Sequence, residues 1–276
     1  MWGRGVLAVV GALVLAACQS PREALEHRAA EYGREVQVLA LESFPLLVVA
    51  PAQMPTANVL RVYLEGDGHA WVTPSQPSLD PTPRQSLVVD LAMQDPTPSL
   101  YMARPCQFVS VPGCTPALWT SRRFSPEVLD SLGQALDRLK ARYGNQGFEL
   151  VGYSGGGALA LLLAGRREDV WQVQTLAGNL SPAEWARMLE LTPLEGSLEP
   201  LQYRERLARI PQRHLLGAED RQVPADVAAF YARQLGEARC LELVSLPGVT
   251  HERGWQQAWP SWRQRSLACA PVERKD

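Results

Sequence analysis

The stretch FELVGYSGGGALALLLAG, residues 148–165, decides the fold. It begins as a short apolar segment typical of a buried strand and ends in a run of Ala and Leu that favours a helix. Between them Ser154 stands in the pattern G-x-S-x-G, which presents a serine hydroxyl when a strand precedes it and a helix follows. Glycines fit such a turn because it is strained and crowded. We therefore predict a nucleophilic Ser154, with the backbone N–H of Gly155 directed at a developing oxyanion; the alternative is a tight turn without chemistry.

A serine nucleophile requires a general base, and the chain has only four histidines. His251 follows the predicted strand at 241–248 and precedes the last predicted helix. His214 lies inside the predicted strand RHLLG (213–217), where a side chain is more often packed in the core. We predict His251 as the base.

The acid is expected on the loop after RHLLG, which reads GAEDRQVP at residues 217–224. Glu219 and Asp220 are both available there. Asp220 is preferred because the run G-x-x-D-x-x-V-P resembles the acid loop of many α/β-hydrolases. The alternative role for Asp220 is that of an N-terminal helix residue ahead of Pro224, and the two roles are compatible.

Ser154, Asp220 and His251 follow one another in the order of the α/β-hydrolase superfamily, each just after a predicted strand, and the chain resembles that superfamily over residues 36–268. The resemblance implies acyl transfer. His251 would deprotonate Ser154 and protonate the leaving group, while Asp220 would hold the imidazole tautomer. Water activated by His251 would then hydrolyse the acyl-enzyme.

The resemblance also implies a second oxyanion donor, in the turn YLEGDGHAW at residues 63–71. Glu65-Gly66 stands where the family commonly has His-Gly, so the matching donor is the N–H of Asp67, with Gly68 as its neighbour. The alternative is a surface turn with acidic caps. Two carboxylates in this turn predict negative charge beside the site, and therefore poor turnover of anionic substrates.

Strands that alternate with helices predict an α/β fold with a mostly parallel central sheet covered by helices on both faces, in one domain at residues 36–270. The clearest helix is 125–144, with Pro126 in its first turn. The charged segment 182–209 is a candidate for a small helical cap. Trp71, Trp119, Trp185 and Trp255 are candidates for lining an acyl pocket, although core packing is the default for each.

The first twenty residues, MWGRGVLAVVGALVLAACQS, are typical of an export signal, with one Arg before a short apolar run and small residues after it. The ending LAAC at 15–18 resembles the lipobox of bacterial lipoproteins. We predict a signal peptide at 1–17, lipidation and membrane attachment at Cys18, and a tether and helix at 18–35. Gln19 after the cysteine favours the outer membrane of the cell envelope. The alternatives are an ordinary signal peptide and an uncleaved anchor.

Four further cysteines, an even number, favour disulfides in an exported domain. They are Cys106, Cys114, Cys240 and Cys269. Three pairings are open, and proximity along the chain suggests Cys106–Cys114 and Cys240–Cys269. No C-x-x-C or His/Cys cluster points to a metal, so none is predicted.

Composition narrows the functional classes. The chain of 276 residues has a formal charge of −2, and its Lys and Arg are scattered, so no nucleic-acid partner is expected. The run GYSGGG lacks the G-x-G-x-x-G spacing of a dinucleotide site, and no cofactor is expected. The leading prediction is a serine hydrolase, foremost a carboxylic ester hydrolase, acting on a small-molecule or lipid acyl substrate. A serine peptidase, a perhydrolase and a non-catalytic envelope lipoprotein remain as alternatives.

Overall fold

The computed structural model describes residues 19–267 and Cys269. The predicted signal peptide and Cys18 lie outside the described residues, so their predictions stay open. Within the described part, no helix is both long and apolar enough to cross a membrane.

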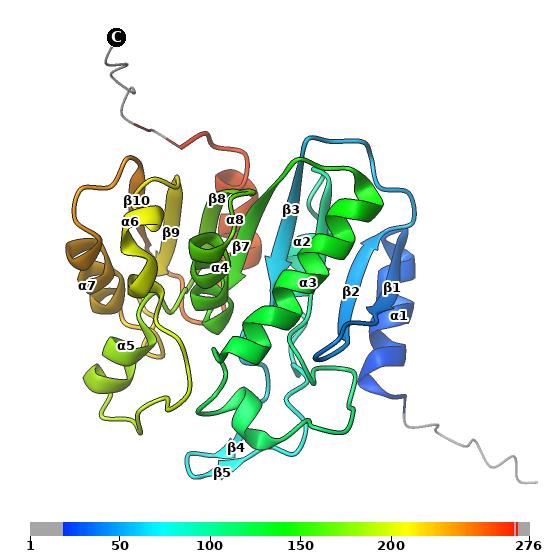
Figure 1. Cartoon of the computed structure of the whole chain (residues 1–276), viewed down its shortest axis with the longest axis horizontal. Coiled ribbons are helices and arrows are strands. Elements are labelled where there is room, and N and C mark those ends of the chain that lie inside the picture. Colours follow the sequence, from blue (N-terminus) through cyan, green and yellow to red (C-terminus); the bar gives the residue numbers. More distant parts are fainter. Residues whose placement is uncertain (1–18, 268, 270–276) are drawn as a thin grey trace, which may run out of the picture.

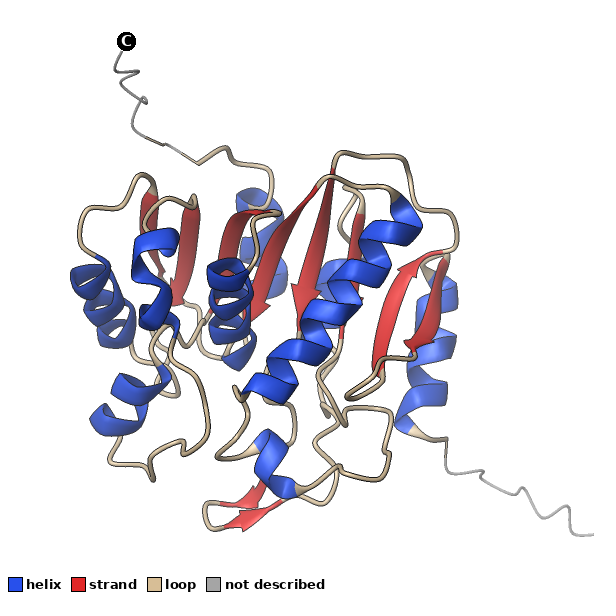
Figure 2. Cartoon of the chain, in the orientation of Figure 1, coloured by secondary structure: helices blue, strands red, loops and turns tan. Residues whose placement is uncertain are grey.

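One eight-stranded sheet forms the centre of the molecule (Figures 1 and 2). Its strands are, in chain order, β1 (Arg34–Leu39), β2 (Leu46–Pro51), β3 (Val59–Leu64), β6 (Ser99–Met102), β7 (Gly147–Tyr153), β8 (Val170–Leu176), β9 (Gln212–Gly217) and β10 (Leu241–Leu246). Across the sheet they lie in the order β1-β2-β6-β3-β7-β8-β9-β10. Only the pairings of β2, with β1 and with β6, are antiparallel. The predicted mostly parallel sheet is confirmed.

Helices cover both faces of this sheet, as predicted (Figure 1). One face carries α1 (Pro21–Glu31), α2 (Leu87–Met93) and α8 (Trp255–Trp262), and the other carries α3 (Pro126–Tyr143), α4 (Gly155–Arg166), α6 (Arg204–Leu207) and α7 (Ala225–Leu235). Two separate apolar clusters fill the space between the sheet and each helical layer. The remaining elements are α5 (Pro182–Met188) and the short 3-10 helices η1 (Pro116–Trp119) and η2 (Pro200–Tyr203).

Local sequence explains where α3 begins and ends. Pro126 occupies its first turn, where a missing N–H is harmless. Its buried face includes Val128, Leu132 and Leu136, at the predicted helical spacing. Gly144 ends the helix with φ 70°, a left-handed conformation that favours glycine.

Two local features were not evident from the sequence. The Pro-rich stretch after β3 contains a small hairpin, β4 (Trp71–Thr73) with β5 (Gln76–Pro77). The last helix, α8, ends at Trp262. Beyond it the buried Arg213 donates hydrogen bonds to the carbonyls of Arg265 and Ser266, at 2.8 Å each, and these bonds hold the chain in a non-helical course.

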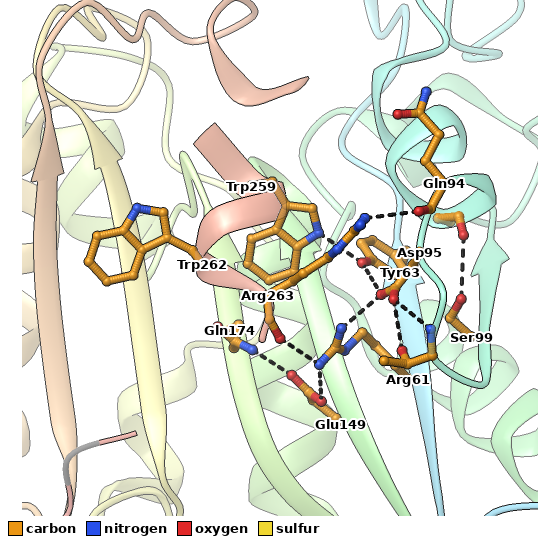
Figure 3. A network of polar contacts seen from close by, with 12 residues as sticks. Arg61, Tyr63, Gln94, Asp95, Ser99, Glu149, Gln174, Trp259, Trp262 and Arg263 are labelled. Atoms are coloured by element: carbon orange, nitrogen blue, oxygen red, sulfur yellow. Dashed lines mark hydrogen bonds and ion pairs between the residues drawn. The ribbon is translucent and has the colours of Figure 1, made fainter. Parts of the chain in front are cut away.

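A buried polar network fixes α8 on the sheet (Figure 3). Arg61 of β3 pairs with Asp95 at 2.8 Å and with Glu149 of β7 at 2.9 Å. The Tyr63 hydroxyl donates to Asp95 at 2.5 Å and accepts from Trp259 Nε1 of α8 at 2.8 Å. A buried ion pair is weak evidence for stability, so we interpret the network by its position: through the bond from Trp259 to Tyr63 it connects α8 to the sheet.

Two disulfides join the four cysteines, Cys106 to Cys114 and Cys240 to Cys269. These are the pairings that proximity along the chain suggested. The second one connects the start of β10 to the segment that follows α8.

Candidate active site

Ser154 lies between β7 and α4, at the edge where β3 and β7 end. Its φ of 51° and ψ of −121° place it in a strained backbone region, as expected for a serine on a sharp strand-to-helix turn. The turn also passes very close to the end of β3. A Cβ on Gly156 would lie 2.5 Å from the carbonyl oxygen of Leu64, and one on Gly152 would lie 2.2 Å from that of Gly156. Side chains at these two positions are therefore excluded by backbone atoms.

The structure brings the three predicted catalytic residues together. His251 Nε2 lies 3.0 Å from Ser154 Oγ, and His251 Nδ1 lies 2.8 Å from Asp220 Oδ2. The other oxygen of Asp220 accepts the backbone N–H groups of Gln222 and Val223, at 2.8 and 2.9 Å. These bonds fix the carboxylate toward the imidazole, so that a hydrogen-bonded chain runs from acid to base to hydroxyl.

The alternative acid, Glu219, and the other histidine that follows Ser154, His214, make different contacts. Glu219 Oε1 accepts the backbone N–H of Gly248 at 3.0 Å. His214 is completely buried in the sheet, bonded to Thr175 and Gln212, and burial lowers its pKa to about 3. A histidine held neutral in the core is the packed residue that the sequence predicted.

Two aromatic side chains hold the histidine loop, and the sequence analysis did not assign them this role. The His251 carbonyl accepts from the Tyr153 hydroxyl at 3.0 Å and from Trp255 Nε1 at 2.8 Å. The Tyr153 ring also lies 5.3 Å from the imidazole, centroid to centroid. Tyr153 is the variable residue before the serine in G-x-S-x-G, so the motif itself ties the Ser154 turn to the His251 loop. Trp255 starts the helix that the network in Figure 3 positions.

The turns that carry the two predicted oxyanion donors also lie next to one another. A Cβ on Gly155 would lie 2.1 Å from Asp67 Oδ1, so the two turns are in direct contact. Within the described part of the chain, neither the N–H of Gly155 nor that of Asp67 donates a hydrogen bond. Gly68 shapes the second turn, because its φ is 64° and a Cβ there would lie 2.1 Å from the carbonyl oxygen of Pro81.

The charge beside the site differs from the sequence expectation. The Asp67 carboxylate is clamped between the guanidinium groups of Arg104 and Arg123, whose side chains are only 4% and 6% exposed. Burial raises the pKa of Asp67, but the two cations more than offset this, and the resulting pKa lies below the usual value. Burial raises the pKa of Glu65 to about 7, although it accepts from Gly66 N–H and the Tyr101 hydroxyl.

The expectation of a negatively charged site is therefore wrong. Two guanidinium groups face one ionised carboxylate, and Glu65 carries a proton below about pH 7. Arg104 and Arg123 belong to no motif, and their spacing from Asp67 in the sequence gives no sign of the pairing.

A cavity of about 730 Å³ opens over Ser154 and His251. Trp71 and Trp185 line it, as the sequence suggested, whereas Trp119 and Trp255 are buried in the protein. The segment 182–209 contributes Trp185 and residues 191–194 to the wall, and Trp185 Nε1 donates to the carbonyl of Gln222 in the acid loop at 2.7 Å. Apolar side chains share the lining with polar ones, a composition typical of small-molecule sites.

Among residues 19–267, the structure shows no group of three or more His, Cys, Asp or Glu side chains arranged to hold a metal ion.

Comparison with known proteins gives a fold assignment. No protein-family model and no curated protein sequence matches the chain. Solved structures do match. Est1E from Butyrivibrio proteoclasticus has a TM-score of 0.59 at 15% identity, with 82% of this chain and 95% of that one covered.

Two further structures agree with it. The Pyrococcus furiosus esterase Pf2001 has a TM-score of 0.61 at 12% identity, covering 85% of this chain and 91% of that one. An alpha-beta serine hydrolase homologue from Coxiella burnetii has a TM-score of 0.53 at 15% identity, covering 83% and 93%. Together with the observed sheet order, these likenesses show that the chain has the α/β-hydrolase fold.

Proposed function

We propose that the protein is a serine hydrolase that cleaves carboxylic esters through a covalent acyl-enzyme. The observation that carries the proposal is the hydrogen-bonded chain Asp220–His251–Ser154, which ends at an open cavity. Esterases among the proteins of the same fold support it as an analogy.

In the first half of the reaction, Ser154 Oγ attacks the carbonyl carbon while His251 Nε2 takes its proton. The negative charge that develops on the carbonyl oxygen is stabilised by the N–H groups of Gly155 and Asp67, which have no acceptor in the described structure. His251 then protonates the leaving alkoxide, so the C–O bond breaks and the acyl group stays on Ser154. Asp220 stabilises the imidazolium during both transfers.

In the second half, water gives a proton to His251 and attacks the acyl-enzyme. The tetrahedral intermediate collapses, and Ser154 Oγ takes the proton back from His251 Nε2. The products are the free acid and the alcohol.

Covalent labelling tests the proposal. The protein without residues 1–17, carrying Ser in place of Cys18, is treated with a fluorophosphonate probe beside Ser154→Ala, His251→Ala and the exposed control His27→Ala. We expect labelling in the parent protein and the control only, and a matching loss of short-chain 4-nitrophenyl ester hydrolysis. Thioesters and small amides complete the substrate panel. A folded parent protein that takes no label and hydrolyses no ester would overturn the proposal.

We propose in addition that the chain is exported and anchored to the envelope through Cys18. The lipobox-like sequence and the two disulfides support this, because disulfides persist in oxidising compartments. Mass spectrometry of the full chain isolated from bacterial membranes tests it. An unmodified Cys18, or a retained signal segment, would contradict it.

A further inference from the structure

The cavity over Ser154 has a cationic wall on the side of the oxyanion turn. Arg123 belongs to this wall and lines the cavity, and its guanidinium lies 5.8 Å from the centroid of the Trp185 ring and makes two polar contacts. Its Nη1 pairs with Asp67, and its Nε donates to the carbonyl of Thr120 at 2.5 Å. Behind it, Arg104 pairs with the other oxygen of Asp67 and donates to the carbonyl of Arg123 at 2.5 Å.

One end of the Arg123 guanidinium is left without an acceptor. Its Nη2 makes no hydrogen bond to any residue of the described structure, although only 6% of the side chain is exposed. His69, on the same turn as Asp67, also lines the cavity and has a buried Nε2 with no partner. A buried polar atom such as His69 Nε2 is normally satisfied, so a polar group of a ligand accounts for it. Arg123 lines the same cavity, so its Nη2 can donate to a ligand bound there.

The charges around the cavity favour an anion as that ligand. On the buried wall, the Asp67 carboxylate faces two guanidinium groups, and burial raises the pKa of the other acid there, Glu65, to about 7. At the rim, the exposed Arg84 and Glu252 have opposite charges and offset one another. Since a hydrogen bond from a guanidinium to an anion is charge-assisted, the Nη2 of Arg123 suits a carboxylate or a similar group.

The position of Arg123 limits where the anion can lie. Gly155 contacts the Asp67 carboxylate, and that carboxylate bonds Arg123, so the guanidinium lies one side chain away from the oxyanion site. We propose that Arg123 binds an anionic group of the substrate, and that the protein prefers esters with a carboxylate or similar anion a few bonds from the scissile carbonyl. This inference rests on the proposed esterase function and names its substrate class.

The test compares matched anionic and neutral esters. One arm places the anion in the acyl part, with mono-4-nitrophenyl succinate against 4-nitrophenyl methyl succinate. The other arm places it in the leaving group, with 3-acetoxybenzoate against its methyl ester. The measured quantity is the ratio of kcat/KM for the anionic and the neutral ester, after subtraction of nonenzymatic hydrolysis.

Arg123→Gln is the test variant and Arg122→Gln is its matched control. Arg122 is the neighbouring residue, but it forms an exposed pair with Glu127 and does not line the cavity. A charged hydrogen bond in a buried site contributes about 1.5–3 kcal/mol, so Arg123→Gln should lower the ratio in one arm at least about tenfold. The control should change it less than about twofold, as for a surface pair.

The outcomes separate the role of Arg123 from the proposed esterase function. Equal losses for both esters in Arg123→Gln would overturn the inference, because Arg123 would then act only by holding Asp67. If Arg123→Gln does not fold, inhibition of the wild type tests the inference instead. Glutarate should inhibit the hydrolysis of a neutral ester more strongly than glutaramide does. Equal inhibition by the two compounds overturns the inference. A wild type that takes the fluorophosphonate label but ignores substrate charge overturns this inference alone. A wild type inert to label and to every ester overturns the proposed function.

Discussion

Glu65→Gln should change how the stability of the protein depends on pH. The Glu65 carboxyl is 4% exposed, and burial raises its pKa to about 7 from an ordinary value of 4.5. Between these two values the folded state binds more protons than the unfolded state. The contribution of Glu65 to stability is therefore fully present below about pH 4.5 and is lost as the pH rises toward 7. Linkage over these two pKa values gives a loss of about 2–3 kcal/mol between pH 5 and pH 8.

Urea unfolding with intact disulfides, at pH 5 and at pH 8, measures this effect. The free energy of unfolding of the wild type should fall by about 2–3 kcal/mol more than that of Glu65→Gln over this interval, because glutamine does not ionise. In thermal melts this corresponds to a difference of about 5–10 °C for a domain of this size. Glu237→Gln, at an exposed position between α7 and β10, should follow the wild type. Parallel pH dependence in the wild type and Glu65→Gln would refute the assignment of a raised pKa to this carboxyl.

Two further substitutions test the geometry around Ser154. Tyr153→Phe removes one of two hydrogen bonds to the His251 carbonyl. The kcat for a neutral ester should therefore fall about three- to tenfold, and the free energy of unfolding should fall by about 1 kcal/mol. An unchanged kcat would contradict a positioning role for this hydroxyl. Gly156→Ala places a Cβ 2.5 Å from the carbonyl oxygen of Leu64 and should abolish ester hydrolysis or soluble expression. Gly133→Ala is the control, because this glycine lies on α3 with open space around it. The control should raise the free energy of unfolding by about 0.5–1 kcal/mol. Similar melting temperatures for the two alanine variants would contradict the close approach of the nucleophile turn to β3.

Local patterns predicted the parts of the fold that local interactions determine. The strand, turn and helix around Ser154 were evident because apolar runs and glycines specify them within eighteen residues, 148–165. The end of α8 was not evident, because Arg213 of a distant strand binds the carbonyls that follow Trp262. The hairpin β4–β5 lies in a segment whose prolines argue against regular structure, and each of its strands has at most three residues.

The residues of the candidate site also include some that local sequence patterns predict and others that only long-range contacts bring together. Ser154, Asp220 and His251 were predicted to lie together because each follows a strand, and the ends of parallel strands meet at one edge of a sheet. The structure places their side chains in hydrogen-bond contact. The clamp on Asp67 was missed because Arg104 and Arg123 lie 37 and 56 residues further along the chain, in irregular segments. Only tertiary packing brings them to the oxyanion turn.

The clamp also explains how a carboxylate can stand beside an oxyanion site. A charge about 5 Å from the developing oxyanion would oppose it by about 3 kcal/mol at an effective dielectric constant near 20, which is comparable to the whole contribution of one oxyanion donor. Two guanidinium groups reverse the sign of this local charge, and they fix the Asp67 side chain so that its backbone N–H stays in place. Replacing Asp67 with a neutral residue would leave two buried cations facing each other, so the aspartate and the arginines require one another. The acidic turn EGDG therefore belongs to a cationic wall. The sign of the electrostatic potential at this turn depends on Arg104 and Arg123, which lie outside the local sequence.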